Sequence, residues 1–132
     1  MKKLLYLFLT VLVVSCSSDD DDGGSVSFVG SWQLNSRVID GVEVHDSCDL
    51  QNNLVLTGFN DGVYDVYDNF PDPNICEFDV AYDVTWSKVG DVEYLITVGN
   101  SIPFQTVLTN VLTLYDGENG STGNSYIVYT KN

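Results

Sequence analysis

The chain has few basic residues, and histidine and methionine occur once each. Its 132 residues include five Lys and Arg against 19 Asp and Glu, which gives a formal charge of −14. Such a negative surface repels phosphate backbones, so nucleic acid is excluded as a partner. His45 is the only histidine, which leaves few nitrogen ligands for a metal centre.

Long apolar runs are also scarce, and the one present is LLYLFLTVLVV at residues 4–14, directly after Lys2 and Lys3. Eleven residues rise about 16 Å as a helix, roughly half of a ~30 Å hydrocarbon core. The run is too short to span a membrane and fits the apolar region of a secretory signal. A buried terminal helix or strand is the alternative, but four aspartates follow and leave nothing local to pack against. We therefore predict a signal peptide over residues 1–15.

The end of this run, Val13-Val14-Ser15-Cys16, resembles the lipobox of bacterial lipoproteins. In that family the signal peptide is cut just before the cysteine, which then carries acyl chains on its sulfur and its amine. The resemblance implies that Cys16 is the lipid attachment site, palmitate included, and that the membrane is a partner. Several acyl chains, at about 0.8 kcal/mol per buried CH₂, anchor a protein far more firmly than one chain.

Residues 16–25 are predicted to form an acidic tether. Asp19–Asp22 repel one another and cannot pack, and Gly23 and Gly24 add flexibility. An acidic patch after the lipid cysteine resembles the surface-export signal of lipoproteins in some Gram-negative lineages. Ser17 stands where enteric-type sorting uses an aspartate for inner-membrane retention. The expected location is the bacterial outer membrane, with the protein anchored by lipid and facing the exterior.

Cysteine is the next residue in short supply, with three in the chain. If Cys16 carries lipid, Cys48 and Cys76 remain as an even pair in an oxidising compartment. A metal site would need more ligands than these two thiols and His45. We therefore predict a Cys48–Cys76 disulfide.

The body of the chain alternates with a period of two and shows no helical period. The clearest segment is CEFDVAYDVTWSKV at 76–89, in which Phe78, Val80, Tyr82, Val84 and Trp86 share one face. This pattern predicts a long strand with that face inward. Further strands are predicted, after the first one at Trp32, at 52–59, 62–68, 91–98, 104–110, 111–116 and 125–131.

Turn residues separate these segments, including Asp40-Gly41, Asn60-Asp61-Gly62 and Gly99-Asn100. About eight short strands result, with no room for a helix. A sandwich and a closed barrel both fit this pattern. Closure would remove exposed sheet edges, but periodicity alone does not choose.

An ordered set of features resembles the lipocalin-like lipoproteins, which are small barrels of bacterial outer membranes. These features are Gly30-Ser31-Trp32, Cys48-Asp49, Asp61-Gly62, Cys76, the strand LTLYD at 112–116 and the terminal Tyr129-Thr130-Lys131. The resemblance covers about residues 28–131. It implies an all-β, antiparallel up-and-down barrel of about eight strands, which we place at residues 26–132.

The resemblance also implies a structural role for three residues. In lipocalins the tryptophan of the Gly-x-Trp motif plugs the closed end of the barrel, and a basic side chain from the last strand lies over its ring. Gly30, Trp32 and Lys131 are the matching positions, with Arg37 as a weaker candidate for the cation. Such a cation–π contact contributes about 1 kcal/mol.

Catalytic and metal patterns are weak. His45, Asp46 and Ser47 are adjacent, but consecutive side chains of an extended segment point to opposite faces and cannot form a relay. The loop 68–74, DNFPDPN, concentrates oxygen ligands that Ca²⁺ accepts, yet its spacing differs from that of an EF-hand. An ordinary rigid loop is the favoured interpretation. No enzyme activity, cofactor or metal is predicted.

Two functions remain. The first is a barrel that binds a small hydrophobic or amphipathic ligand, with the candidate contacts Tyr67, Phe78, Tyr82, Trp86 and Tyr94. The second is a lipid-tethered interaction or inhibitor module with a filled core, whose loops 68–75 and 117–124 contact a surface protein, a protease or polysaccharide machinery. Phe70 is the apolar anchor available to it. The volume of the interior decides between the two.

Overall fold

A computed structural model describes residues 26–116 and 123–132. The predicted signal peptide and tether lie outside these residues. No helix in the described part of the chain is long and apolar enough to cross a membrane. The elements are β1 (Gly30–Ile39), β2 (Val42–Glu43), the 3₁₀ turn η1 (Asp49–Gln51), β3 (Asn53–Leu56), β4 (Asp61–Asp68), β5 (Glu77–Lys88), β6 (Glu93–Val98), β7 (Phe104–Leu108), β8 (Leu112–Tyr115) and β9 (Tyr126–Lys131).

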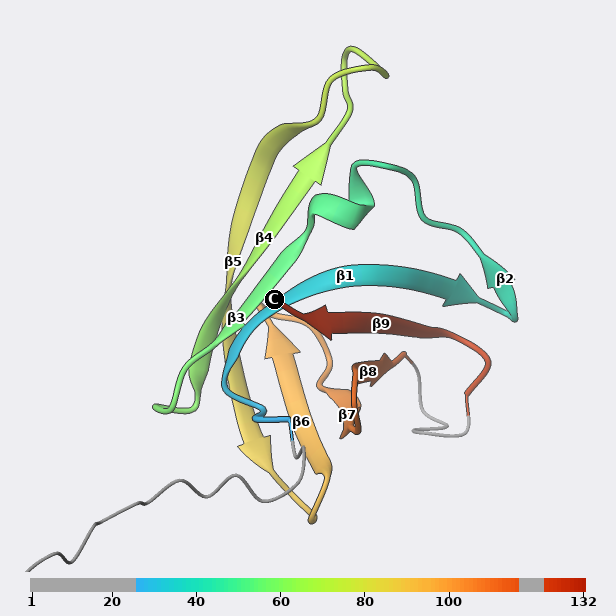
Figure 1. Ribbon diagram of the computed structural model, residues 1–132. Coiled ribbons are helices and arrows are strands. Elements are labelled where there is room, and N and C mark those ends of the chain that lie inside the picture. Colours follow the sequence, from blue (N-terminus) through green and yellow to red (C-terminus); the bar gives the residue numbers. More distant parts are fainter. Residues whose placement is uncertain (1–25, 117–122) are drawn as a thin grey trace, which may run out of the picture.

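The strands form one antiparallel sheet that closes on itself (Figure 1). From β3 to β9 each strand pairs with the next in sequence, and β1 pairs with both β3 and β9. The pairing of Leu34 with Tyr129 lies in the seam that closes the barrel. The result is an eight-stranded up-and-down barrel in which β2 is an extra strand on the end of β1. This confirms the predicted all-β barrel, and the sandwich alternative is wrong.

The two ends of the barrel differ. At the end where β1 begins lie the turns β3–β4, β5–β6 and β7–β8, together with residues 26–29, which we call the plug. We name this the closed end. At the other end, which we name the open end, lie the β1–β2 turn, the segment 44–52, the β4–β5 connection and the β6–β7 turn.

The core fills the barrel from the closed end to about its middle. Its largest fully buried side chains include Trp32, Leu54, Ile96, Leu112 and Tyr129, which come from five different strands. These positions alternate with more exposed ones along each strand, because successive side chains point to opposite faces of the sheet. Neighbouring strands therefore contribute every second residue to one interior.

Strands β4 and β5 extend past their neighbours and project from the open end as a two-stranded hairpin (Figure 1). The prediction that the whole face of strand 76–89 points into a core is therefore wrong in its first half. Val84 is buried, but Tyr82 is 43% and Phe78 is 56% exposed. Phe78 packs instead on Tyr67 across the hairpin, with ring centroids 5.9 Å apart. Among the described residues, no opposing strand covers this part of the sheet.

A disulfide joins Cys48 to Cys76, as predicted. Cys48 precedes η1 and is buried, and Cys76 immediately precedes β5. The bond therefore fixes the segment 44–52 of the open end to the β4–β5 connection of the projecting hairpin, where β5 begins. It closes a sequence separation of 28 residues, which in the chain-entropy model contributes roughly 3–4 kcal/mol of stability.

Candidate functional site

Trp32 and Lys131 meet at the closed end as the resemblance implied. The Trp32 side chain is fully buried, and Lys131 Nζ lies 4.6 Å from the centroid of its ring. The same ammonium donates hydrogen bonds to the backbone oxygens of Ser27 (2.6 Å) and Val29 (2.5 Å). Burial lowers the pKa of Lys131. The lysine thus holds the plug against the barrel.

Gly30 makes this arrangement possible. Its φ of +136° lies in a region that side chains rarely adopt, and a Cβ there would stand 2.6 Å from Lys131 Nζ. A glycine is therefore required where the lysine crosses the backbone. The Gly-x-Trp pattern has a local physical reason in this chain.

Phe28 completes the closure. Its ring stacks on Tyr94 with a centroid distance of 3.6 Å and meets the edge of Trp86 at 4.8 Å. Its backbone oxygen accepts a hydrogen bond of 2.9 Å from Trp32 Nε1. Phe28 is 5% exposed, so the plug behaves as part of the core. Ligand access through this end is blocked.

A pocket of about 340 Å³ lies toward the open end. Volumes of about 300–1,000 Å³ are typical of small-molecule sites. The buried and half-buried part of the lining comes from five strands, β4, β6, β7, β8 and β9, while Gly99, Asn100 and Ser101 of the β6–β7 turn form part of the rim. The apolar and aromatic lining residues are Tyr64, Tyr82, Val98, Phe104, Leu114, Ile127 and Tyr129. The pocket therefore offers an apolar interior reached from the open end.

Two tyrosines supply polar groups to this lining. The rings of Tyr64 and Tyr129 meet edge to face at 6.4 Å. Burial raises the pKa of Tyr64, and hydrogen bonding to the side chains of Tyr129 and Asn52 partly offsets the rise. Burial raises the pKa of Tyr129 still further. Both hydroxyls are therefore neutral near pH 7 and can serve a ligand as hydrogen-bonding groups.

The five predicted ligand contacts do not meet in one place. Tyr82 lines the pocket. Trp86 and Tyr94 belong to the aromatic cluster at the closed end. Tyr67 and Phe78 form a pair on the projecting hairpin. Of the five, only Tyr82 is positioned to touch a molecule in this pocket.

A second hollow of about 280 Å³ lies over β6 and β7, next to the β5–β6 turn. Its lining mixes the inward residues Tyr94 and Thr106 with Leu95, Gln105 and Val107, which alternate with them along the strands. It is therefore a groove at the barrel wall and not an interior cavity. We favour the open-end pocket as the ligand site because its lining is more apolar and lies inside the sheet.

The carboxylates of the loop 68–74 are engaged locally. Asp68 Oδ1 accepts the amide of Asn69 at 2.6 Å, and Asp72 Oδ1 accepts the amide of Asn74 at 2.9 Å. Within residues 26–116 and 123–132, no group of three or more His, Cys, Asp or Glu side chains could hold a metal ion. These contacts describe a turn built from Asx hydrogen bonds.

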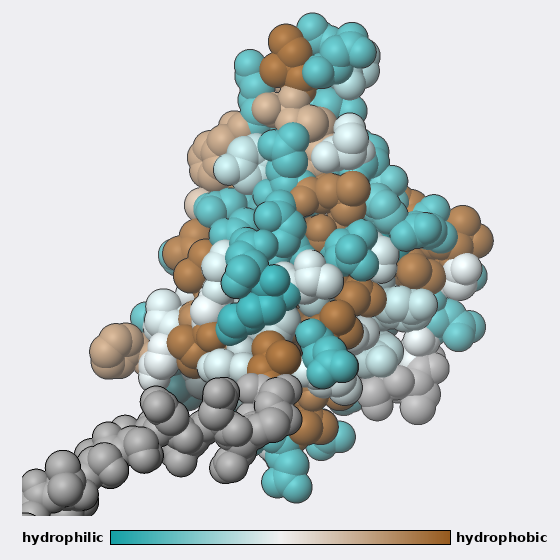
Figure 2. All heavy atoms as spheres, in the orientation of Figure 1, coloured by the Kyte–Doolittle hydropathy of each residue, from teal (hydrophilic) through white to brown (hydrophobic). Residues whose placement is uncertain are grey.

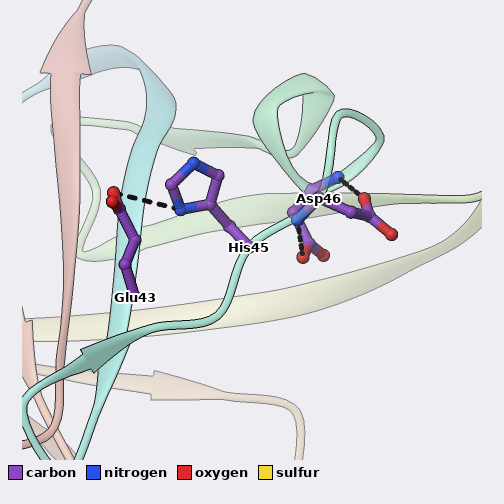
Figure 3. Close-up of polar contacts among 4 residues, drawn as sticks. Glu43, His45 and Asp46 are labelled. Atoms are coloured by element: carbon purple, nitrogen blue, oxygen red, sulfur yellow. Dashed lines mark hydrogen bonds and ion pairs between the residues drawn. The ribbon is translucent and has the colours of Figure 1, made fainter.

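His45 and Asp46 contact different partners, because His45 faces Glu43 and the Asp46 carboxylate turns to the backbone that follows it (Figure 3). Asp46 Oδ1 accepts the amides of Cys48 (2.7 Å) and Asp49 (2.9 Å) and so shapes the turn into η1. His45 Nδ1 lies 3.3 Å from Glu43 Oε1, close enough for an ion pair when the histidine is protonated. The contact is not aligned as a hydrogen bond, and Nδ1 has no other partner in the part of the chain that the structure describes.

The sequence pointed to Trp32 and Lys131 at the closed end, but it gave no sign of Phe28 there or of the pairing of Tyr64 with Tyr129 in the open-end pocket. Phe28 precedes the first strand and carries no periodic signal. Tyr64 and Tyr129 lie 65 positions apart on strands β4 and β9, so only the closed sheet brings them together. Asn52 is 4% exposed and accepts the Tyr67 amide at 2.7 Å. A single buried asparagine between turn and strand gives no signal in sequence.

The chain was compared with protein families, curated proteins and solved structures. No family model matches the chain, and neither the curated proteins nor the solved structures include a match. The class that the fold defines is an eight-stranded up-and-down barrel, closed at one end and hollow at the other.

Proposed function

We propose that this protein is a lipocalin-like lipoprotein that is anchored by lipid on Cys16 at the outer membrane, faces the cell exterior and binds a small hydrophobic or amphipathic molecule. The observation that carries the proposal is the pocket of about 340 Å³ at the open end. Its apolar lining would remove hydrocarbon from water, and the hydroxyls of Tyr64 and Tyr129 would orient a polar group.

The closed end supports this interpretation. Phe28, Trp32 and Lys131 seal it, so a ligand would enter and leave only past Tyr82 and the β6–β7 turn. Two of these residues, Trp32 and Lys131, agree with the lipocalin-like resemblance, in which a tryptophan and a basic residue close the barrel. The lipid anchor and the location rest on the sequence resemblance at residues 13–16.

The ligand site can be tested by blocking it. Val98 lines the pocket, whereas Val63 on β4 is 39% exposed and is absent from its lining. The chain from residue 17 onward, exported so that the disulfide forms, would be titrated with the apolar dye 8-anilinonaphthalene-1-sulfonate. Val98→Trp should abolish saturable dye binding, and Val63→Trp should leave it intact. Equal binding by both variants would remove the pocket as the site.

A second function is favoured by one observation, the exposed tip of the β4–β5 hairpin. Phe70 is 83% and Ile75 is 51% exposed there, on an element that projects away from the barrel. Such a tip could contact a surface protein or a protease. A photo-crosslinking phenylalanine analogue at Phe70 on intact cells should then give a discrete adduct that the same analogue at Ile102 does not give.

A further inference from the structure

The closed end exposes apolar side chains on its turns. Phe59 in the β3–β4 turn is 88% exposed, and Val89 and Val92 in the β5–β6 turn are 57% and 48% exposed. Val29 of the plug is 38% exposed beside them. Figure 2 shows apolar surface at the β3–β4 turn, on the left, and near the β5–β6 turn below. None of these side chains belongs to the core or to the open-end pocket.

The chain enters the barrel at this same end. Val26 is the first described residue, and the plug runs from it directly into β1 (Figure 1). Residues 16–25 span at most about 35 Å when fully extended. β1 alone, with ten residues, is about 33 Å long. A group attached at Cys16 therefore reaches the closed end easily, but it reaches the open end only with the tether stretched along the whole barrel.

Charge separates the two ends as well. The acidic residues in or next to the closed-end turns are Asp61, Asp91 and Glu93, and Lys88 and Lys131 lie near them. The open end carries many more carboxylates on its turns and on the hairpin, namely Asp40, Glu43, Asp46, Asp49, Asp68, Asp72 and Glu77.

Exposed apolar residues occur at the open end too, for example Ile102 at 86%. That end as a whole, however, carries the larger number of acidic groups, which a surface of phosphate headgroups repels. On the described part of the closed end, the apolar tips stand among three carboxylates and two lysines. The point at which the chain enters and the charge of the barrel surface therefore both favour the closed end, and Asp19–Asp22 of the tether lie on the path from Cys16 to it.

We propose that the closed end is a membrane-contact surface, on which Phe59, Val89 and Val92 rest on the lipid while the open-end pocket faces away from it. The proposed contact surface rests on the proposed lipid anchor at Cys16. The tether would hold the barrel close to the bilayer, so that even weak apolar contacts become populated through their high effective concentration. The pocket mouth would then be directed toward the medium.

The test attaches the chain to a bilayer by chemistry, so that it does not depend on acylation in a cell. Cys48 and Cys76 are joined to each other, which leaves Cys16 as the one thiol of the three cysteines in the sequence. Residues 16–132 would be coupled through Cys16 to vesicles of phosphatidylethanolamine and phosphatidylglycerol that contain a maleimide lipid. A second lipid would carry a nitroxide in the upper acyl chain to quench tryptophan emission.

Two variants report on the two ends. Phe59→Trp places a probe at the closed end and Ile102→Trp at the open end, at positions of nearly equal exposure, 88% and 86%. Emission from Trp32 and Trp86 is measured in the parent chain and subtracted. The nitroxide should quench the added emission of Phe59→Trp several-fold more than that of Ile102→Trp. Adding Val89→Glu and Val92→Glu should return the Phe59→Trp signal to the level of Ile102→Trp.

Equal quenching of the two probes, or stronger quenching of Ile102→Trp, would overturn the proposed contact surface. The second outcome would show that the pocket mouth faces the lipid. Acylation of Cys16 is read separately, from the mass of the protein purified from bacterial membranes. A mass without acyl chains would rule out the natural anchor at Cys16, and the result with vesicles would still stand.

Discussion

Removing the ring of Phe28 should destabilise the barrel strongly, although this residue precedes the first strand. Phe28 is 5% exposed, stacks on Tyr94 at 3.6 Å and touches Trp86 edge to face at 4.8 Å. Truncation of a buried Phe to Ala costs about 3–5 kcal/mol. Since small domains have about 5–15 kcal/mol of stability in total, Phe28→Ala should remove a large part of it.

Urea unfolding followed by tryptophan fluorescence measures this loss, because Trp86 lies against Phe28 and reports on the same cluster. Phe59→Ala is the matched control. It removes the same side chain at the same end of the barrel, but from a position that is 88% exposed, and should change stability by no more than about 0.5 kcal/mol. A Phe28→Ala variant as stable as the Phe59→Ala variant would refute the plug.

Three further outcomes follow from the structure. Replacing Cys48 and Cys76 by Ala should cost roughly 3–4 kcal/mol, seen as a lower urea midpoint, and adding a reductant should then have no further effect. Burial raises the pKa of Tyr64 and Tyr129 above the ordinary 10.0, so the folded state keeps protons that the unfolded chain loses. The two tyrosines should therefore leave the free energy of unfolding unchanged below pH 10 and lower it above pH 10, by up to about 1.4 kcal/mol per pH unit for each tyrosine. Tyr129→Phe should make this fall less steep. Lys131→Met should lose about 1–2 kcal/mol, because the cation over Trp32 and two hydrogen bonds to the plug disappear; a thermal midpoint equal to that of the parent chain would contradict the lysine's role.

The number and type of the elements could be read from the sequence because alternation is a local property. The strand predicted at 76–89 is β5 at Glu77–Lys88, and the turn at Asp40-Gly41 has positive φ at both residues. Both of these inferences need only a residue and its near neighbours. The disulfide, which joins residues 28 positions apart, could be predicted from the number of cysteines, because only one pair remained once Cys16 was assigned to lipid.

The interior could not be read in the same way. Alternation shows which side chains share a face, but neighbouring strands decide whether that face is covered. Phe78 and Val84 have the same parity in the sequence, but the register shift between Val66 and Tyr67 pairs Phe78 with Tyr67 and so turns it to the other face, on the uncovered hairpin, while Val84 lies in the core. Such a shift is invisible in the alternation. For this reason the five ligand contacts predicted from the sequence lie in three different parts of the structure.

The pocket depends on contacts between distant strands. Tyr64, Leu114 and Tyr129 come from β4, β8 and β9, and their convergence requires the closure of β1 on β9. Neither the register of that closure nor the space left by these side chains is encoded in any short segment. A sequence reading could supply aromatic candidates but not their arrangement.

Native mass spectrometry of the chain from residue 17 onward, exported from bacteria and purified without detergent, would show whether the open-end pocket holds a ligand. We expect a reproducible added mass that survives gentle ionisation, is lost on denaturation and is missing from Val98→Trp, which fills the pocket. The same added mass on Val98→Trp would contradict ligand binding in this pocket, because the bound molecule would then lie elsewhere. A bare mass for the parent chain that stays bare after incubation with a fatty acid would likewise count against a ligand-binding barrel.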